Sequence, residues 1–418
     1  IMKFTSTEAT PAPHVPPGVL RLTGAAKEDI PMYRIQTMNK ISPVGLNRFP
    51  SELYEVGDAV QDPQGILVRS AKLLDLEFNP GLLAIARAGV GVNNIPLDRC
   101  AAAGIPVFST PGANANAVKE LVICAMLMGS RDIPGAIRWV REQAASGVDV
   151  STVVEKGKSA FIGPELYKKT LGIIGLGAIG SIVANTAISL GMDVYGYDPF
   201  LSVDTALRLD RHVHVVKDIN DLYKRSDYIT MHIHYTEKTA HMIDADAIAA
   251  MKRGVRVINL ARGEIVDDEA MLTALDTGMV AAYITDFPNN RLLTAPHVIA
   301  MPHLGASTPE SEENCAVMAA QELRDYLENG NIKNSVNFPD ATLERMGVSR
   351  VCILHQNVPT MLNQFLEITC STGLNVENMI NKAYGAYAYA MIDLNGRLDD
   401  DQVAKIDRIP EVIRVRVV

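Results

Sequence analysis

Three glycines in the middle of the chain constrain its fold more than any other feature. Gly175, Gly177 and Gly180 follow the apolar run Leu171–Ile174 and precede a helical pattern that continues to about Leu190. The first glycine permits a tight turn, the second lets a ligand approach the backbone, and the third lets a helix pack closely on a strand. This order of strand, turn and helix predicts a βαβ unit in a parallel sheet.

The same segment predicts a dinucleotide cofactor. The N-terminus of the helix after the turn offers free N–H groups and the positive end of a helix dipole, which suit a pyrophosphate. The next strand is expected to end at Asp198, eighteen residues after Gly180. A carboxylate there can accept hydrogen bonds from ribose hydroxyls and would repel a 2′-phosphate, so the pattern favours NAD over NADP.

Strands and helices alternate over most of the 418 residues, which predicts an α/β protein with two doubly wound, Rossmann-like domains. Before them, residues 1–31 contain five prolines and little apolar periodicity, so we expect a disordered extension. Residues 336–348 are polar and irregular and are expected to form a linker. The pattern of residues 349–418 is βαββαβ, which predicts a separate ferredoxin-like domain.

Charge and cysteine content narrow the function classes. The formal net charge of −9 excludes the basic surface of a nucleic-acid-binding protein. The five cysteines are far apart and form no CxxC pair, which argues against a disulfide scaffold or a zinc finger and favours the cytoplasm. No apolar run reaches the ~18–20 residues of a membrane span, so no membrane partner is expected. No metal site is expected either.

Several motifs occur in an order that resembles the D-isomer-specific 2-hydroxyacid dehydrogenases. The motifs are Leu67–Ser70, Ala86–Asn94, the Gly175–Gly180 fingerprint, Asn259–Gly263 and Pro302–Thr308. The resemblance implies that residues 32–116 and 304–335 form a substrate-binding domain and that 117–303 form the NAD-binding domain. It also implies that residues 349–418 are an ACT domain, a small ligand-sensing module.

The resemblance implies two catalytic residues. His303 matches the histidine that takes the hydroxyl proton, a role that imidazole suits near neutral pH. Arg262 matches the arginine that holds the substrate carboxylate. The family's glutamate partner of the histidine is missing, because Asp286 is followed by Phe-Pro-Asn-Asn. Asn290 is a neutral candidate for that place and Glu264 an acidic one. With a neutral partner, we expect the acid limb of the pH–rate profile to lie at lower pH than in a glutamate-containing relative.

The resemblance also implies the binding residues. For the cofactor they are Val90, Gly175, Gly177, Ala178, Ile179, Gly180, Asp198, Ile233, Leu260, Asp286, His303, Gly305 and Ala306. For the substrate they are Arg69, Ser70, Arg87, Val92, Asn93 and Arg262. Arg69 and Ser70 stand where the branch of the family that acts on D-3-phosphoglycerate meets the phosphate, and guanidinium and hydroxyl donors suit that group.

The C-terminal domain offers an effector site by resemblance. His355 and Asn357 match the ligand loop of serine-sensing ACT domains, and Asn375 matches a second asparagine twenty residues after His355. L-serine is therefore an expected effector, bound across a domain dimer. The alternative is an ACT domain retained only for assembly. A homo-oligomer, dimer or tetramer, is expected from the resemblance.

The expected function is NAD-dependent oxidation of D-3-phosphoglycerate to 3-phosphohydroxypyruvate, which opens the phosphorylated route to serine. A first alternative is another D-2-hydroxyacid dehydrogenase, acting on glycerate or hydroxypyruvate. A second is a non-catalytic NAD-sensing protein, which the missing glutamate favours and the retained Arg262 and His303 oppose.

Overall fold

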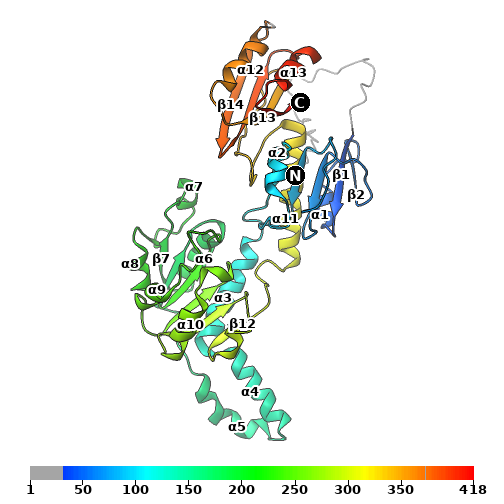
Figure 1. Cartoon of the computed structure of the whole chain (residues 1–418). Coiled ribbons are helices and arrows are strands. Elements are labelled where there is room, and N and C mark those ends of the chain that lie inside the picture. The colour runs from blue at the N-terminus through cyan, green and yellow to red at the C-terminus, as the bar shows by residue number, and fades with distance from the viewer. Residues whose placement is uncertain (1–31, 372) are drawn as a thin grey trace, which may run out of the picture.

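The chain folds around three sheets that follow one another along an elongated molecule (Figure 1). The computed structural model describes residues 32–371 and 373–418, so the expected extension 1–31 lies outside the described residues. The sheets have five, seven and four strands in chain order. In the described part of the chain, no helix is both long and apolar enough to cross a membrane.

The first sheet is parallel and has the order β2-β1-β3-β4-β5. Its strands are β1 (Tyr33–Met38), β2 (Tyr54–Gly57), β3 (Gly65–Val68), β4 (Ala84–Arg87) and β5 (Val107–Phe108). The short helices α1 (Pro43–Leu46) and α2 (Leu97–Ala102) belong to the same unit. This is a doubly wound order, in which ligands bind beyond the carboxyl ends of the strands.

The second sheet is also parallel and has the order β12-β11-β10-β9-β6-β7-β8. Its strands are β6 (Thr170–Ile174), β7 (Asp193–Tyr197), β8 (His214–Val216), β9 (Tyr228–Met231), β10 (Val255–Asn259), β11 (Val280–Thr285) and β12 (Val298–Ala300). Its helices are α6 (Ala178–Ser189), α7 (Val203–Ala206), α8 (Ile219–Tyr223), α9 (Ala245–Ala249) and α10 (Asp268–Asp276), with 3-10 turns at Gly263–Ile265 and Leu292–Thr294. Read from β8, this is the strand order of dinucleotide-binding domains.

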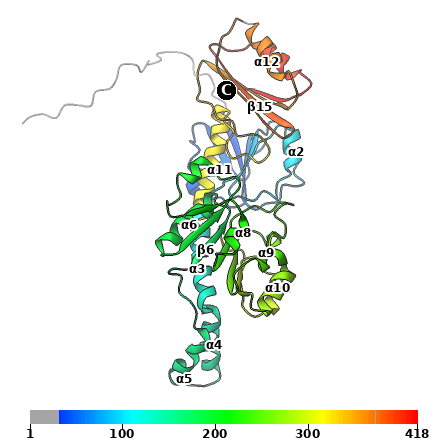
Figure 2. The same ribbon diagram turned by 90° about the vertical axis from the view of Figure 1, so that its left-hand side faces the viewer.

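Two long helices connect these sheets. Helix α3 (Ala115–Arg131) leads from the first sheet to the second, and α11 (Pro309–Asn329) returns (Figures 1 and 2). Between α3 and β6, an arm projects from the molecule. It consists of α4 (Ile133–Ala145), α5 (Val150–Gly157) and a 3-10 turn (Lys158–Phe161), and none of its side chains is buried.

The third sheet is antiparallel with the order β14-β15-β13-β16. Its elements are β13 (Ser349–Gln356), α12 (Met361–Cys370), β14 (Val376–Tyr384), β15 (Tyr387–Leu394), α13 (Asp400–Asp407) and β16 (Val412–Val417). Their order along the chain is βαββαβ. The predicted fold class, two doubly wound parallel sheets and a ferredoxin-like C-terminal unit, is confirmed.

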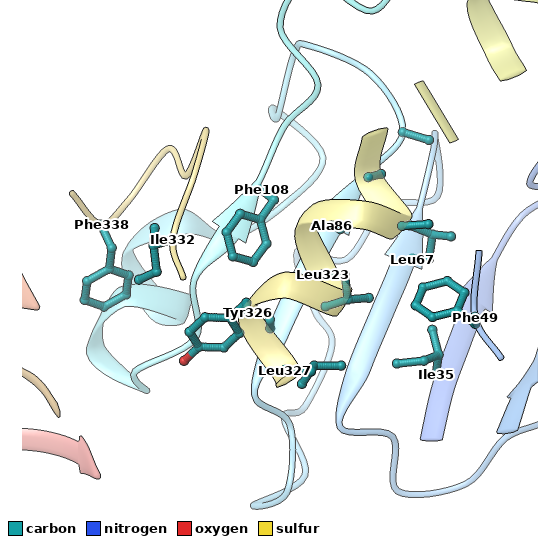
Figure 3. Close-up of a cluster of buried hydrophobic side chains, with 14 of the residues drawn as sticks. Ile35, Phe49, Leu67, Ala86, Phe108, Leu323, Tyr326, Leu327, Ile332 and Phe338 are labelled. Carbon is teal, nitrogen blue, oxygen red and sulfur yellow. The ribbon is translucent and has the colours of Figure 1, made fainter. Parts of the chain in front are cut away.

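The first sheet and the C-terminal sheet share one core, built around α11 (Figure 3). Leu323, Tyr326 and Leu327 of α11 pack with residues of the first sheet, and Leu354 and Tyr389 of the C-terminal sheet belong to the same cluster. Burying each large apolar side chain contributes about 1.5–3 kcal/mol. The C-terminal sheet is therefore held against the first sheet and α11 by a continuous apolar contact.

The segment 336–348 differs from the linker expected from its composition. It is irregular, but Phe338 and Ala341 are buried in the shared core. The Asn337 side chain accepts from the Val107 N–H at 2.9 Å and donates to the Ile105 carbonyl at 3.0 Å. The composition of this segment is typical of a linker because its polar residues show no periodic pattern. The backbone groups with which Asn337 forms hydrogen bonds lie more than two hundred residues earlier in the chain.

Helix α11 also buries a carboxyl group, which gives a stability prediction. Glu322 accepts from Asn334 Nδ2 at 2.6 Å, but its other oxygen has no partner in the described structure. Burial raises the pKa of Glu322 from 4.5 to about 8. The unfolded chain therefore loses this proton at lower pH than the folded chain, and the folding penalty grows between pH 4.5 and 8.

We expect Glu322→Gln to raise the free energy of unfolding by roughly 1–3 kcal/mol at pH 8 and by much less near pH 4.5. Urea titrations at several pH values measure this. The matched control is Glu310→Gln, an exposed glutamate on the same helix. A gain that is the same at every pH would contradict a titrating Glu322.

Candidate active site

The glycine-rich turn has the geometry that its sequence predicts. Gly175 has φ +89°, and a Cβ there would lie 2.6 Å from the His232 carbonyl oxygen and 2.7 Å from Ile233 Cγ2. A Cβ at Gly180 would collide with the Gly175 carbonyl oxygen. Positive φ and close backbone contact both require glycine. The turn therefore brings Ile233, an expected cofactor residue, against the start of the fingerprint.

The N-terminus of α6 fits a pyrophosphate. Gly177 is its N-cap, and a Cβ there would meet nothing within 4 Å, so the backbone is open to a ligand. Asp198 follows β7 and accepts from the Leu176 N–H at 2.9 Å and the Phe200 N–H at 2.8 Å. These bonds fix the carboxylate beside the turn, where ribose hydroxyls would reach it.

Asp286 fits the other end of the same cofactor. It follows β11, is 1% exposed, and its Oδ2 accepts from the Gly305 N–H at 3.2 Å. Its Oδ1 has no hydrogen-bond partner among the described residues. Burial raises the pKa of Asp286. A buried acceptor without a partner is costly, and the amide N–H of a nicotinamide carboxamide is the kind of donor that would satisfy it.

The remaining expected cofactor residues are placed unevenly. Leu260 is 7% exposed and belongs to the core of the second sheet, so its side chain cannot meet a ligand and only its backbone remains available. Ala178 is exposed, and Val90, Ile179 and Ala306 are half-buried. Contact between these residues and the cofactor stays a prediction.

An aromatic ring links the two expected catalytic residues. The His303 ring packs on Phe287 with centroids 4.6 Å apart, and the Arg262 guanidinium lies 5.7 Å from the same ring centroid. His303 is exposed, and Arg262 is half-buried. Contacts of this kind orient side chains and contribute about 0.5–1.5 kcal/mol each. Phe287 therefore positions the base and the arginine relative to each other.

The substitute partners considered for His303 do not contact it. Asn290 is exposed and makes no hydrogen bond to the ring, and Glu264 is an exposed residue of a neighbouring pocket with His241 and Asp267. Within residues 32–371 and 373–418, the His303 ring makes no hydrogen bond or ion pair. The charge of His303 acts through space on the buried Asp286, where it opposes the rise in the pKa of that carboxyl caused by burial. The expected position of the acid limb stays a prediction.

Arg262 is held by a locked turn. The fully buried Asn259 accepts from the Ala261 N–H at 3.2 Å and donates to the Arg262 carbonyl at 2.8 Å. Arg262 Nη1 donates to the Ala261 carbonyl at 2.6 Å. This short loop after β10 aims the guanidinium toward the first sheet, where Nη2 lies 3.2 Å from the position of a Cβ on Gly91.

Three arginines converge on the loop after β4. Arg87 Nη1 lies 3.9 Å from the same position on Gly91, and Arg87 Nε donates to the Arg69 carbonyl at 3.1 Å. Burial, Arg262 and Arg69 all lower the pKa of Arg87. Three guanidinium groups that repel one another define a site for an anion, because a bound anion relieves the repulsion. Val92 is half-buried and Asn93 exposed beside this loop.

Two asparagines that the sequence reasoning missed hold the Arg69–Ser70 loop. Asn39, with φ +73°, accepts through Oδ1 from the Ser70 N–H at 3.1 Å and from the Ala71 N–H. Asn94 Nδ2 donates to the Ala71 carbonyl at 2.7 Å. The available signal was an asparagine at the carboxyl end of β1, since asparagine tolerates the left-handed region. Asn114 before α3 was also missed, and its Oδ1 is a buried acceptor without a partner in the described residues.

The residues expected to bind an effector do not meet within one chain. His355 pairs with Ala388 in the sheet, whereas Asn375 immediately precedes β14, which starts opposite Leu394. Six strand residues, or about 20 Å, separate these ends. His355 is buried, and its ring contacts the Gln356 carbonyl at 2.8 Å and Asn381 at 3.0 Å. Asn357 donates to the Gly385 carbonyl at 3.2 Å.

The described residues contain no group of three or more His, Cys, Asp or Glu side chains that could hold a metal ion. The site therefore consists of a dinucleotide-binding turn, a buried carboxylate, an imidazole and three arginines. These groups suit a nicotinamide cofactor and an organic anion, and an imidazole lies among them.

Comparison with known proteins agrees with this geometry. Residues 123–305 match the family model described as "D-isomer specific 2-hydroxyacid dehydrogenase, NAD binding domain". A D-3-phosphoglycerate dehydrogenase of Haemophilus influenzae is 32% identical over 378 residues, covering 87% of this chain and 88% of the relative. One from Synechocystis is 35% identical over 347 residues, covering 81% of this chain. This chain spans 60% of the Synechocystis protein's length.

A solved structure shows the same relationship. The NAD⁺-bound 3-phosphoglycerate dehydrogenase of Entamoeba histolytica is 27% identical, with a TM-score of 0.57, covering 73% of this chain and 99% of that one. The resemblance drawn from the sequence motifs and the NAD-binding character of the middle domain are both confirmed. The chain belongs to the D-isomer-specific 2-hydroxyacid dehydrogenase family.

Proposed function

We propose that the protein oxidises D-3-phosphoglycerate to 3-phosphohydroxypyruvate with NAD in the cytoplasm. The observation that carries this proposal is the grouping of Arg69 and Arg262 around Arg87, with Arg262 packed on the Phe287 ring that also contacts His303. A substrate with a carboxylate at one end and a phosphate at the other needs two sets of cationic donors. The names of the relatives from Haemophilus influenzae and Synechocystis support the same substrate.

The proposal assigns a role to each residue of the site. Arg262 binds the carboxylate and, through its second donor, polarises the oxygen at C2. His303 accepts the proton of the C2 hydroxyl, and Phe287 keeps the imidazole and the guanidinium on one side of the substrate. The cofactor, when bound, supplies the nicotinamide ring that accepts hydride from C2. The buried Asp286 and the turn at Gly175–Gly180 hold the two ends of that cofactor.

Arg69→Ala tests the proposed substrate. We expect kcat/KM for D-3-phosphoglycerate to fall about 10- to 100-fold, because charge-assisted hydrogen bonds to the phosphate are lost. The value for D-glycerate, which has no phosphate, is expected to change little. Steady-state NAD reduction with both substrates measures the ratio. An equal loss for both would move the assignment to a sister enzyme of unphosphorylated hydroxy acids.

We also propose that the protein assembles as a homo-oligomer through the projecting arm of α4 and α5. Ile137, Val140 and Val154 are exposed on this arm, although apolar side chains are costly in water. Light scattering of the purified protein tests this, and a monomer at micromolar concentration would refute it.

We propose that L-serine inhibits the protein by binding between two C-terminal domains, each from a different chain. His355 and Asn357 of one chain would meet Asn375 of another, since the two ends lie far apart within one chain. Inhibition by L-serine that His355→Ala abolishes would support this. The absence of any response to L-serine in the intact protein would favour a domain that serves assembly alone.

A further inference from the structure

A carboxylate lies inside the arginine site. Glu312 is in the first turn of α11, and its Oε1 is 2.5 Å from Arg69 Nη2. Both side chains keep 42% of their surface exposed, so the pair is reached by solvent and is not part of the core. The guanidinium that the proposed function assigns to the phosphate therefore already has an anionic partner.

The position of Glu312 is set by the start of α11. Thr308 caps the helix by accepting from the Ser311 N–H at 3.1 Å, and Pro309 begins it. Acidic residues in a first turn are stabilised by the helix dipole. Glu310 also lies in the first turn and interacts with the helix dipole, but Glu312 is the residue that forms an ion pair with Arg69. The helix dipole alone therefore does not explain the pair.

The pair and a phosphate compete for the same donors. Arg69 is anchored at its base, because its carbonyl accepts from Arg87 Nε and its loop is bound by Asn39. Its guanidinium contacts Glu312, and its charge also acts on Arg87. A phosphate dianion beside Glu312 would meet like charge unless the carboxylate moves away.

We propose that Glu312 is an internal counter-ion, which occupies Arg69 in the free protein and is displaced by the phosphate dianion of the substrate. This proposal rests on the proposed function, because it concerns the phosphate end of that substrate. A phosphate dianion carries more negative charge than the Glu312 carboxylate, so it displaces Glu312 from Arg69. A substrate that ends in an uncharged group, such as a hydroxyl, cannot displace Glu312. With such a substrate, the Arg69–Glu312 ion pair stays intact.

Glu312→Gln tests the proposal by keeping the shape of the side chain and removing its charge. We expect the KM for D-3-phosphoglycerate to fall roughly three- to tenfold while kcat changes less than twofold, since an exposed pair is weak and its loss affects binding alone. The KM for D-glycerate is expected to stay the same. Glu312→Asp keeps the charge and is expected to resemble the parent more closely than Glu312→Gln does.

The matched control is Glu313→Gln, an exposed neighbour on the same turn without an ion pair in the described structure. It removes the same charge from the same helix end, so any general effect of net charge appears in both variants. The KM for D-3-phosphoglycerate is expected to stay within twofold of the parent in this control.

A binding measurement separates this proposal from the function on which it rests. Calorimetric titration with inorganic phosphate, in the presence of NAD, needs no turnover. Tighter phosphate binding by Glu312→Gln than by the parent and Glu313→Gln supports the counter-ion. Unchanged or weaker phosphate binding by Glu312→Gln, or a raised KM for D-3-phosphoglycerate, overturns the proposal. Glu312 would then be a residue that holds Arg69 in position for the substrate. Failure of the parent to oxidise any phosphorylated acid overturns the function, while the phosphate titration still decides the role of Glu312.

Discussion

Replacement of His303 by asparagine is expected to lower kcat about 10²- to 10⁴-fold, the usual contribution of a general base. Asparagine keeps a polar side chain of similar reach but cannot take the proton of the C2 hydroxyl at neutral pH. The residue is exposed in the loop before α11, and its side chain makes no hydrogen bond within the described residues, so the side-chain contact that the fold loses is the one with Phe287. Steady-state kinetics with D-3-phosphoglycerate and NAD measure the loss.

The chain offers a matched control in His297→Asn. His297 is an exposed histidine six residues earlier, and its φ of +64° is one that asparagine tolerates well. This variant is expected to retain parental kcat. In His303→Asn, the affinity for NAD and the melting temperature are expected to stay close to the parent's. A kcat within tenfold of the parent would contradict the role of His303 as the base.

Asp393→Ala is expected to cost about 3–5 kcal/mol of stability, the usual result of breaking one side of a buried ion pair. Arg350 and Asp393 are both fully buried and form two bonds, Nε to Oδ1 at 2.6 Å and Nη2 to Oδ2 at 2.9 Å. The alanine variant leaves the Arg350 charge buried without a counter-ion. Because Arg350 Nη1 also donates to the Asn329 carbonyl, the end of α11 loosens with it.

The measurement is urea unfolding of the full chain, followed by hydrogen exchange of the C-terminal sheet. The control is Asp401→Ala, which removes the acid of the exposed pair Asp401–Lys405 on α13 and is expected to change little. A double change of Arg350 and Asp393 to Met and Leu is expected to recover much of the loss. An Asp393→Ala variant as stable as Asp401→Ala would show that the pair does not hold the domain.

The parts of the site that local sequence determines were predictable. The turn at Gly175–Gly180, the carboxylate after β7 and the loop that carries Arg262 depend on residues within about twenty positions of one another. Backbone geometry at these places allows few residue types, so the pattern identifies the structure. The parallel pairing of the strands followed from the alternation of strands and helices, because parallel strands need crossover connections.

Contacts between distant segments were not predictable in the same way. Arg69 and Glu312 are 243 positions apart, and a single charged residue in a helix has many solvated alternatives. The segment 336–348 was taken for a linker because its polar residues carry no periodic signal, yet Asn337 satisfies backbone groups of β5. The Phe287 ring contacts both His303 and Arg262, and these contacts depend on the packing of loops that are separate in the sequence.

The most direct test of the central claim is NAD reduction by the purified protein with D-3-phosphoglycerate, compared with D-glycerate and D-lactate, at mildly alkaline pH with a ketone trap. The account predicts a kcat/KM for the phosphorylated acid at least tenfold above the others, because Arg69 and Arg87 meet its phosphate. A preference for D-glycerate or D-lactate would contradict the account and make the protein a sister dehydrogenase. NAD binding without turnover of any of the three acids would also contradict the proposed function. The protein would then be a non-catalytic protein that senses NAD.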